Sequence, residues 1–340
     1  MTLIEPDQAL AETSVAGEDV LVVEDLRVYY DTSQGVLKAV DGVSFSLQQG
    51  QRLALVGESG SGKSTLATAL MGMTTAPGRI DGGHVYLSGR DLLALNRSEM
   101  RMARLSEIAL VPQGAMNSLN PVIRVYKQIV DGIIDHAEGK KPTKEELNER
   151  VEELLRVVGL PSSVARMYPH ELSGGMKQRV VMAIGTSLSP KLIVADEPTS
   201  ALDVVVQRQI METLGQLQEG LNSSVILIGH DMGLIAQFAD MVGIMYAGKL
   251  VELGPVDAIF ENPQHPYTKL LIQSLPSFNK KTEFSGIPGL PPTLLNLPAG
   301  CSFSPRCPFV MDTCKVDEPV SREVLPGQRA SCHLFEGDQE

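Results

Sequence analysis

The chain has 340 residues, of which 43% are hydrophobic and 21% charged, and its 29 basic and 41 acidic side chains give a formal net charge of −12. This composition excludes disordered and fibrous classes. The acidic balance argues against nucleic acid as a partner, because an extended nucleic-acid surface needs basic groups to neutralise phosphates. The length fits one large domain or two smaller ones.

The N-terminal residues 1–19 are expected to form a flexible acidic segment. They carry five Asp or Glu and no Lys or Arg, which is the opposite of the basic start of a signal peptide. No uncharged apolar run in the chain approaches the roughly 20 residues that span a bilayer. The simplest interpretation is a cytoplasmic protein.

Residues 20–276 alternate short apolar runs with helical stretches, which predicts an α/β domain. Strands are expected at 52–56, 192–195 and 225–228, each followed by polar residues. Near-continuous apolar strands are typical of a parallel sheet buried on both faces, and such sheets bind ligands beyond the carboxyl ends of their strands. Chemistry is therefore expected where these three strands end.

Residues 57–64 fit the phosphate-binding pattern G-x-x-x-x-G-K-[ST] between an expected strand and helix. The backbone N–H groups and the helix N-terminus would face phosphates, Lys63 would reach the β- and γ-phosphates, and Ser64 would ligate Mg²⁺. The alternative is a Gly-rich turn without function. The predicted nucleotide contacts here are Gly57, Glu58, Ser59, Gly60, Ser61, Gly62, Lys63, Ser64 and Thr65.

A mostly helical region is predicted for about 114–185. Thr143 and Glu146 form a capping box, and the apolar side chains that follow repeat at helical spacing, which favours a helix packed on its neighbours. Ser173, Gly174 and Gly175 open a further helix as a second phosphate-binding N-terminus. Since one P-loop already satisfies the phosphates of one ATP, this turn indicates an interface at which two chains enclose the nucleotide.

Two acids follow the expected strand 192–195. Asp196 would hold the Mg²⁺ hydration shell, and Glu197 would orient or polarise the attacking water. Acids are common at strand ends, so this pair indicates a function only together with the P-loop. His230, after the next strand, would contact the γ-phosphate, although a lone His is more often structural.

Residues 277–340 are predicted to form a separate, loop-rich appendage, because frequent prolines make continuous helix improbable. All four cysteines fall here, and a disulfide framework is not expected in a cytosolic ATPase. Four thiolates would bind an iron–sulfur cluster or Zn²⁺ with a structural role, or remain unmetallated; the gaps between them are wider than the tight pairs of structural zinc sites. The cysteines are Cys301, Cys307, Cys314 and Cys332.

The order of the motifs resembles the ATP-binding subunit of an ABC transporter. It runs 57–64, Gln113, 172–176 (LSGGM), 192–198 (LIVADEP), 200–203 (SALD) and His230. The resemblance implies ATP and Mg²⁺ as cofactors, with Ser64, Gln113 and Asp196 at the metal. It also implies that Glu197 is the general base, that His230 is a switch, and that Gln113 senses the γ-phosphate and signals to a permease.

The resemblance further implies contacts outside the P-loop. Tyr30 would stack on adenine, with Tyr29 as the alternative after a shift of one residue. The turn at 173–175 would cap ATP held by the opposite subunit, and Asp203 would tie the two halves together. Met176 stands where Gln is commoner and Gly229 where Thr or Ser is usual, but neither departure removes a charge or ligand, so hydrolysis is still expected.

The flanking motifs resemble the oligopeptide/dipeptide/nickel import family, and its D-type ATPase in particular. They lie at 69–73, 78–80, 117–121, 168–171, 265–268, 287–292, 297–301 and 305–308. Some relatives with such a tail resemble [4Fe-4S] carriers. The resemblance implies ATP-driven uptake of peptides, oligosaccharides or nickel, with the chain peripheral on the cytoplasmic face of the cell membrane.

The partners implied are a second, different ATPase subunit, two transmembrane permease subunits and an extracytoplasmic solute-binding protein; a homodimer is the alternative to the heterodimer. The rival function is that of a soluble ABC ATPase in DNA repair or translation. Such proteins usually carry tandem ATPase domains or a long coiled coil, and this sequence contains neither.

Overall fold

The strands of this protein, in a computed structural model that describes residues 19–114, 118–139, 141–274 and 286–336, form two sheets. The smaller sheet is antiparallel, in the order β2-β1-β4-β5, and the larger has the order β11-β12-β10-β9-β3-β8-β7-β6. The acidic segment expected at 1–18 and the boundary expected at 276/277 lie outside the described residues, as does Asn117. Asp19 is the first residue of β1.

The strand bounds follow the chain as β1 Asp19–Thr32, β2 Gly35–Gln48, β3 Arg52–Val56, β4 Gly78–Leu87, β5 Arg90–Asp91, β6 Ile108–Val111, β7 Leu192–Asp196, β8 Ser224–Ile228, β9 Met241–Tyr246, β10 Lys249–Pro255, β11 Ser321–Leu325 and β12 Gln328–Ser331. The helices are α1 Lys63–Leu70, α2 Arg97–Ser106, α3 Val125–Asp135, α4 Lys144–Val157, α5 Gly174–Gly185, α6 Val204–Leu221, α7 Met232–Phe238, α8 Val256–Glu261, α9 Pro266–Gln273 and α10 Thr313–Val316. Within the described ranges, no helix combines the length and the apolar character that crossing a membrane requires.

The centre of the larger sheet is parallel, as the apolar strands predict. β3 pairs in parallel with both β8 and β9, and β7 pairs in parallel with β8 and β6. The residues of β7 and β8 are buried throughout, since side chains on both faces of the sheet pack into apolar cores. The carboxyl ends of β3, β7 and β8 therefore lie side by side.

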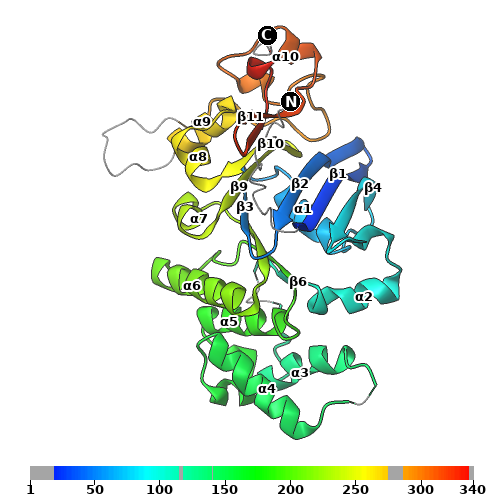
Figure 1. Ribbon diagram of the computed structural model, residues 1–340, viewed down its shortest axis with the longest axis vertical. Coiled ribbons are helices and arrows are strands. Elements are labelled where there is room, and N and C mark those ends of the chain that lie inside the picture. The colour runs from blue at the N-terminus through cyan, green and yellow to red at the C-terminus, as the bar shows by residue number, and fades with distance from the viewer. Residues whose placement is uncertain (1–18, 115–117, 140, 275–285, 337–340) are drawn as a thin grey trace, which may run out of the picture.

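The helical region lies at one end of the elongated chain, opposite the C-terminal end, with the central sheet between them (Figure 1). Its helices α3, α4 and α5 pack on one another through a core continuous with that of the central sheet. The predicted capping box is present: the Thr143 hydroxyl accepts from the Glu146 N–H at 3.2 Å, and the Glu146 carboxylate accepts from the Thr143 N–H at 2.6 Å. The sequence prediction of this helix is confirmed.

The C-terminal region, which in the described residues is 286–336, is joined to the larger sheet. β12 pairs antiparallel with β10, and β11 pairs with β12, so two strands extend the edge of the larger sheet. Buried Gln328 of β12 donates to the Glu252 carboxylate of β10 at 2.8 Å. Phe303 belongs to the main core. The bounds of the predicted appendage, 277–340, stay a prediction; within the described residues, its two short strands add to an open sheet edge despite nearby prolines.

Candidate functional site

The phosphate loop, residues 57–64, connects β3 to α1, and its backbone requires glycine. Gly62 has φ of 103°, and a Cβ there would lie 2.1 Å from the carbonyl oxygen of Ala39. A Cβ at Gly57 would lie 2.1 Å from the carbonyl oxygen of Met245. At these two positions the loop packs directly against the neighbouring strands β2 and β9, with no room for a side chain. The loop then leads into the N-terminus of α1, where the backbone N–H groups have no hydrogen-bond partner within the helix.

Lys63, the first residue of α1, points back over this loop. Its Nζ donates to the carbonyl oxygens of Gly57 at 2.8 Å and Glu58 at 2.9 Å, and to the Ser61 hydroxyl at 3.2 Å. Burial lowers the pKa of Lys63, and the nearby carboxylates of Glu197, Asp196 and Glu58 oppose that shift. A buried ammonium beside exposed helix N–H groups is an anion site of the kind that holds phosphate.

Ser64 and Asp196 bring together two ligands suited to Mg²⁺. The Ser64 hydroxyl donates to Oδ1 of Asp196 at 3.2 Å, across 132 residues of sequence. Burial raises the pKa of Asp196, the Glu197 charge adds to this, and the Ser64 hydrogen bond and Lys63 oppose it. A cation at this point would stabilise the ionised carboxylate. The donor chemistry therefore fits Mg²⁺, which typically takes one or two protein oxygens together with phosphate and water.

Glu197 lies at the carboxyl end of β7 and faces both Gln113 and His230. Gln113 Nε2 donates to Oε2 of Glu197 at 2.7 Å, and His230 Nδ1 lies 3.7 Å from Oε1. Glu197 has φ of 44°, a left-handed conformation that is uncommon outside glycine and is often found at functional sites. The structure thus gathers Lys63, Ser64, Gln113, Asp196, Glu197 and His230 where β3, β6, β7 and β8 end, as expected for parallel strands.

The turn at 173–175 and Asp203 lie near each other and not among the residues gathered at the strand ends. Ser173 caps α5 by accepting from the Met176 N–H at 3.3 Å, and Asp203 caps α6 by accepting from the Val206 N–H at 3.0 Å. A Cβ at Gly175 would meet Val206 at 2.7 Å, so the two helix starts touch. Among the described residues, no hydrogen bond or ion pair joins either cap to the phosphate loop.

The two candidate tyrosines differ in their contacts. The Tyr29 hydroxyl donates to Oδ1 of Asp41 at 2.6 Å, and burial raises the pKa of Tyr29 to about 12. Its neighbour Tyr30 is half-buried, and its ring lies 2.7 Å from the point where a Cβ at Gly78 would stand. Tyr29 is buried and its hydroxyl is hydrogen-bonded, whereas Tyr30 is more exposed. The ring of Tyr30 is therefore the more accessible of the two.

The four cysteines are free thiols that line one small cavity together with His265 and His333. Burial raises the pKa of Cys332 to about 11 and also raises the pKa values of Cys301 and Cys307. No group of three or more His, Cys, Asp or Glu side chains in the described part of the chain is arranged to hold a metal ion. The expectation of iron–sulfur or zinc binding is therefore not supported here, although the donors gather around one space.

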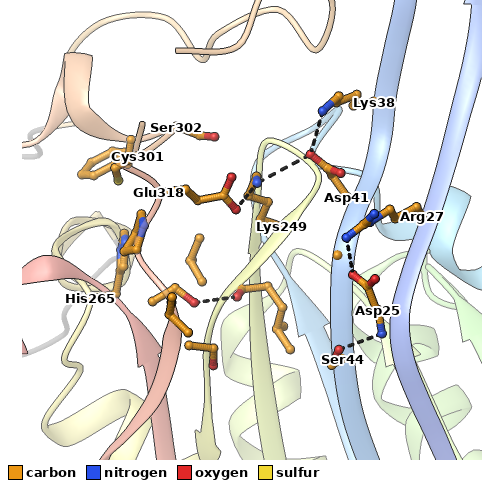
Figure 2. Close-up of a pocket in the computed structure, with 18 of the residues that line it drawn as sticks. Asp25, Arg27, Lys38, Asp41, Ser44, Lys249, His265, Cys301, Ser302 and Glu318 are labelled. Carbon is orange, nitrogen blue, oxygen red and sulfur yellow. Dashed lines mark hydrogen bonds and ion pairs between the residues drawn. The ribbon is translucent and has the colours of Figure 1, made fainter. Parts of the chain in front are cut away.

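A cavity of about 760 Å³, whose lining includes His265 and Cys301, lies between the C-terminal region and the β1–β2 sheet (Figure 2). Its charged groups already pair with one another: Asp41 lies 3.4 Å from Lys38 and 3.5 Å from Lys249, and Lys249 also pairs with Glu318. These pairs bridge β2, β10 and the C-terminal region. The cavity therefore lies at the junction of these elements, and Tyr29, the alternative adenine contact, is the one predicted nucleotide contact among the residues that line it.

Two side chains at the phosphate loop were not predicted. Arg306 of the C-terminal region makes a bidentate pair with the Glu58 carboxylate, at 2.7 and 3.0 Å, and the Tyr267 hydroxyl accepts from the Glu58 N–H at 3.0 Å. Both residues lie in motifs that carry the family resemblance, at 265–268 and 305–308. Those motifs were the only features of the sequence that could have indicated a role for Tyr267 and Arg306. The Glu58 side chain, predicted as a nucleotide contact, is occupied by this pair.

Comparison with protein families gives two separate matches along the chain. Residues 40–200 match the family described as ABC transporter, and residues 251–314 match the family described as oligopeptide/dipeptide transporter, C-terminal region. The first match contains the phosphate loop, Gln113 and both strand-end acids. The second contains Tyr267, Arg306 and all cysteines except Cys332.

Curated relatives extend the similarity over almost the whole chain. The dipeptide transport ATP-binding protein DppD of Lactococcus lactis subsp. cremoris is 43% identical over 325 residues, covering 95% of this chain and 93% of the relative. The oligopeptide transport ATP-binding protein OppD of Escherichia coli is 44% identical over 315 residues, covering 92% of each chain. The dipeptide transport protein DppD of E. coli is 41% identical over 316 residues, covering 92% and 96%.

Solved structures share the central fold. The dimeric structure of MJ0796, described as a bacterial ABC transporter cassette, superposes with a TM-score of 0.63 at 26% identity, covering 69% of this chain and 98% of that one. A dimeric post-hydrolysis state of MJ0796 bound to ADP and Pi gives the same values. The similarity covers nearly all of the cassette and leaves about a third of the present chain outside it.

Proposed function

This chain belongs to the ABC transporter family, in the branch of dipeptide and oligopeptide transport ATP-binding proteins, and we propose that it hydrolyses ATP to drive peptide uptake through a membrane permease. One observation carries the proposal: the phosphate loop, Asp196, Glu197, Gln113 and His230 converge at one edge of the sheet. The match to the peptide-transporter C-terminal region favours peptides over oligosaccharides or nickel as the transported solute.

In the proposed mechanism, Lys63 and the N–H groups at the start of α1 hold the phosphates, and Ser64, Asp196 and Gln113 hold Mg²⁺. When bound, Mg²⁺ neutralises charge that develops on the phosphate oxygens. Glu197, 23% exposed, accepts the proton of the attacking water. Gln113 and His230 flank its two oxygens, so both are placed to orient the carboxylate or the γ-phosphate.

The proposed active unit contains two ATPase subunits. Ser173 is exposed at the start of α5, and Asp203 is exposed at the start of α6, with no partner at the phosphate loop of the described chain. We expect the turn at 173–175 to reach ATP on the opposite subunit and Asp203 to lie at that interface. Tyr30 is proposed to stack on adenine. The assignment of a different second ATPase, rather than a copy of this chain, follows the family resemblance.

The proposed assembly places this chain on the cytoplasmic face of the cell membrane, beneath two permease subunits supplied by an extracytoplasmic solute-binding protein. The test is purification of the chain from native membranes, followed by identification of its partners and measurement of ATP hydrolysis with and without peptide. Co-purifying permeases and peptide-stimulated hydrolysis are expected. Recovery of the chain without any permease would contradict the transport function.

The iron–sulfur cluster, with zinc as its alternative, stays a proposal for the four cysteines. Its basis is donor chemistry, because thiolates are the ligands that both iron–sulfur clusters and zinc prefer and the four thiols line one cavity, although in the described residues they are not arranged as a metal site. Its role would be to order the proline-rich segment. Protein purified anaerobically would contain iron or zinc in stoichiometric amount, and the absence of both metals would exclude the proposal.

A further inference from the structure

The second residue of the phosphate loop, Glu58, is held at three groups, two of which are bound by residues far along the chain. Its carbonyl oxygen accepts from Lys63, as described above. Its N–H donates to the Tyr267 hydroxyl, 209 residues away, and its carboxylate accepts hydrogen bonds from both terminal N–H groups of Arg306, 248 residues away. The C-terminal region and α9 therefore hold the backbone and the side chain of the same loop residue.

Arg306 is a rigid partner rather than a surface charge. Its side chain is 4% exposed, and it closes the 3₁₀ turn η5 (Ser304–Arg306). Besides Glu58, it donates to the carbonyl oxygen of Pro288 at 2.8 Å and to the Tyr246 hydroxyl at 3.3 Å. A planar guanidinium held at this many points fixes the direction of the Glu58 carboxylate, which a flexible surface pair would not do.

Tyr267 supplies the second fixed point. Its side chain is fully buried, its ring packs on Tyr246 at 4.6 Å and on Phe303 at 5.4 Å between centroids, and burial raises its pKa well above the usual range. The hydroxyl that receives the loop N–H is thus neutral and immobile. The loop rests on an aromatic surface that the C-terminal residue Phe303 completes.

The charge of Glu58 matters because of its position. Its carboxylate is one of three that act on Lys63, the group expected to bind the β- and γ-phosphates. Paired with Arg306, this carboxylate is neutralised and turned toward the C-terminal region. Unpaired, it would place a free negative charge beside a site for a polyanion, where the low local dielectric strengthens repulsion.

We propose that Arg306 is a positioning residue of the nucleotide site, which holds the phosphate loop and cancels the Glu58 charge so that the C-terminal region sets the affinity for ATP. The proposal rests on the nucleotide-binding part of the proposed function. It explains why a region outside the cassette similarity contacts the loop directly, and it makes ATP binding responsive to the structural state of the segment that carries the cysteines.

The experiment compares full-length variants by MgATP affinity, by KM and kcat of hydrolysis, and by thermal stability. Arg306→Met is expected to raise the Kd and KM for ATP about tenfold while kcat changes less, because one uncompensated charge near the phosphates opposes binding. Arg306→Met combined with Glu58→Gln is expected to recover most of that loss. Arg322→Met is the matched control. Arg322 also forms an ion pair in the C-terminal region, but its partner is Glu336 and not a residue of the phosphate loop.

The pattern of outcomes separates positioning from simple structural support. Support alone would lower thermal stability in Arg306→Met, and the double variant would then bind ATP no better than the single one; either that result or an unchanged Kd in Arg306→Met overturns the proposal. If Arg306→Met does not fold, Arg306→Lys supplies the test, because a single ammonium keeps the charge but loses the bidentate geometry, so about a threefold rise in KM is expected. Wild-type protein that binds no ATP would instead contradict the proposed function.

Discussion

The nucleotide site and the aromatic cluster beside it use the same sheet in opposite ways. At the nucleotide site the side chains are polar, and two of them are open to solvent: Glu197 is 23% exposed and His230 is 72% exposed. The aromatic cluster, which consists of Tyr246, Tyr267, Phe303 and His265, is closed, and none of its side chains is more than 1% exposed. Its ring centroids lie 4.6–5.8 Å apart.

This difference separates chemistry from stability within one fold. The site side chains carry charge and strain, as in the left-handed backbone of Glu197, and contribute little apolar burial. The aromatic cluster contributes burial and carries no proposed chemical step. Substitutions at the first region should change turnover and leave stability nearly intact, whereas substitutions at the second should act first by lowering stability.

The largest effect is expected for Glu197→Gln. An amide keeps the shape and the contact with Gln113 but cannot accept the proton of the attacking water, so phosphate release should fall about 10²–10⁴-fold. Binding of MgATP and the free energy of unfolding should stay near the wild-type values. Steady-state phosphate release, equilibrium nucleotide binding and denaturant titration measure the three quantities. Turnover that survives this substitution would remove Glu197 as the general base.

Phe303→Ala tests the other side of the comparison. Phe303 is 1% exposed and contacts Tyr246, Tyr267 and His265, so its loss should lower the free energy of unfolding by about 3–5 kcal/mol. The control is Phe309→Ala in the same region, where the side chain is 55% exposed and the change should stay within about 0.5 kcal/mol. Equal stability losses in the two variants, measured by urea titration, would contradict a stabilising cluster.

The two regions also differ in how far the sequence predicted them. Lys63, Asp196, Glu197 and His230 were expected at one edge because each follows an apolar strand, and the carboxyl ends of parallel strands lie at one edge of a sheet. No such rule links Arg306 to Glu58, since the pair closes 248 residues of chain through irregular turns. The addition of β12 to β10 was missed for the same reason: nothing in a short polar strand specifies its partner.

His265, in the aromatic cluster, should make the free energy of unfolding depend on pH. Burial, with a smaller contribution from Lys269, lowers the pKa of His265 to about 3, while its unfolded pKa is about 6.5. The unfolded chain therefore binds a proton that the folded chain does not, so stability is lost as pH falls from about 6.5 toward 3, by about 1.4 kcal/mol per pH unit.

Denaturant titrations of wild type and His265→Asn at pH 7, 6 and 5 measure this effect. In the wild type, Nδ1 of His265 accepts from the Tyr267 N–H at 3.0 Å and caps the start of α9. The amide oxygen of Asn can accept from the same N–H, so the helix stays capped. The difference in unfolding free energy between the two proteins should shrink toward low pH, because the variant lacks the titrating ring. A constant difference across this range would mean that folding leaves the pKa of His265 unchanged.

The smallest effect is expected at Asp203, where a role in stability and a role in function can be told apart. Asp203 caps α6 through the Val206 N–H, so Asp203→Ala should lower the free energy of unfolding by about 1 kcal/mol, while Asp203→Asn keeps the cap and changes it by a few tenths. Urea titration of the monomeric chain measures both. If Asp203 also lies at the interface of two ATPase subunits, ATP-dependent association should weaken in both variants, because the charge is lost in each. Association that weakens only in Asp203→Ala would assign the residue to capping alone, and would place it with the aromatic cluster on the stabilising side of the molecule.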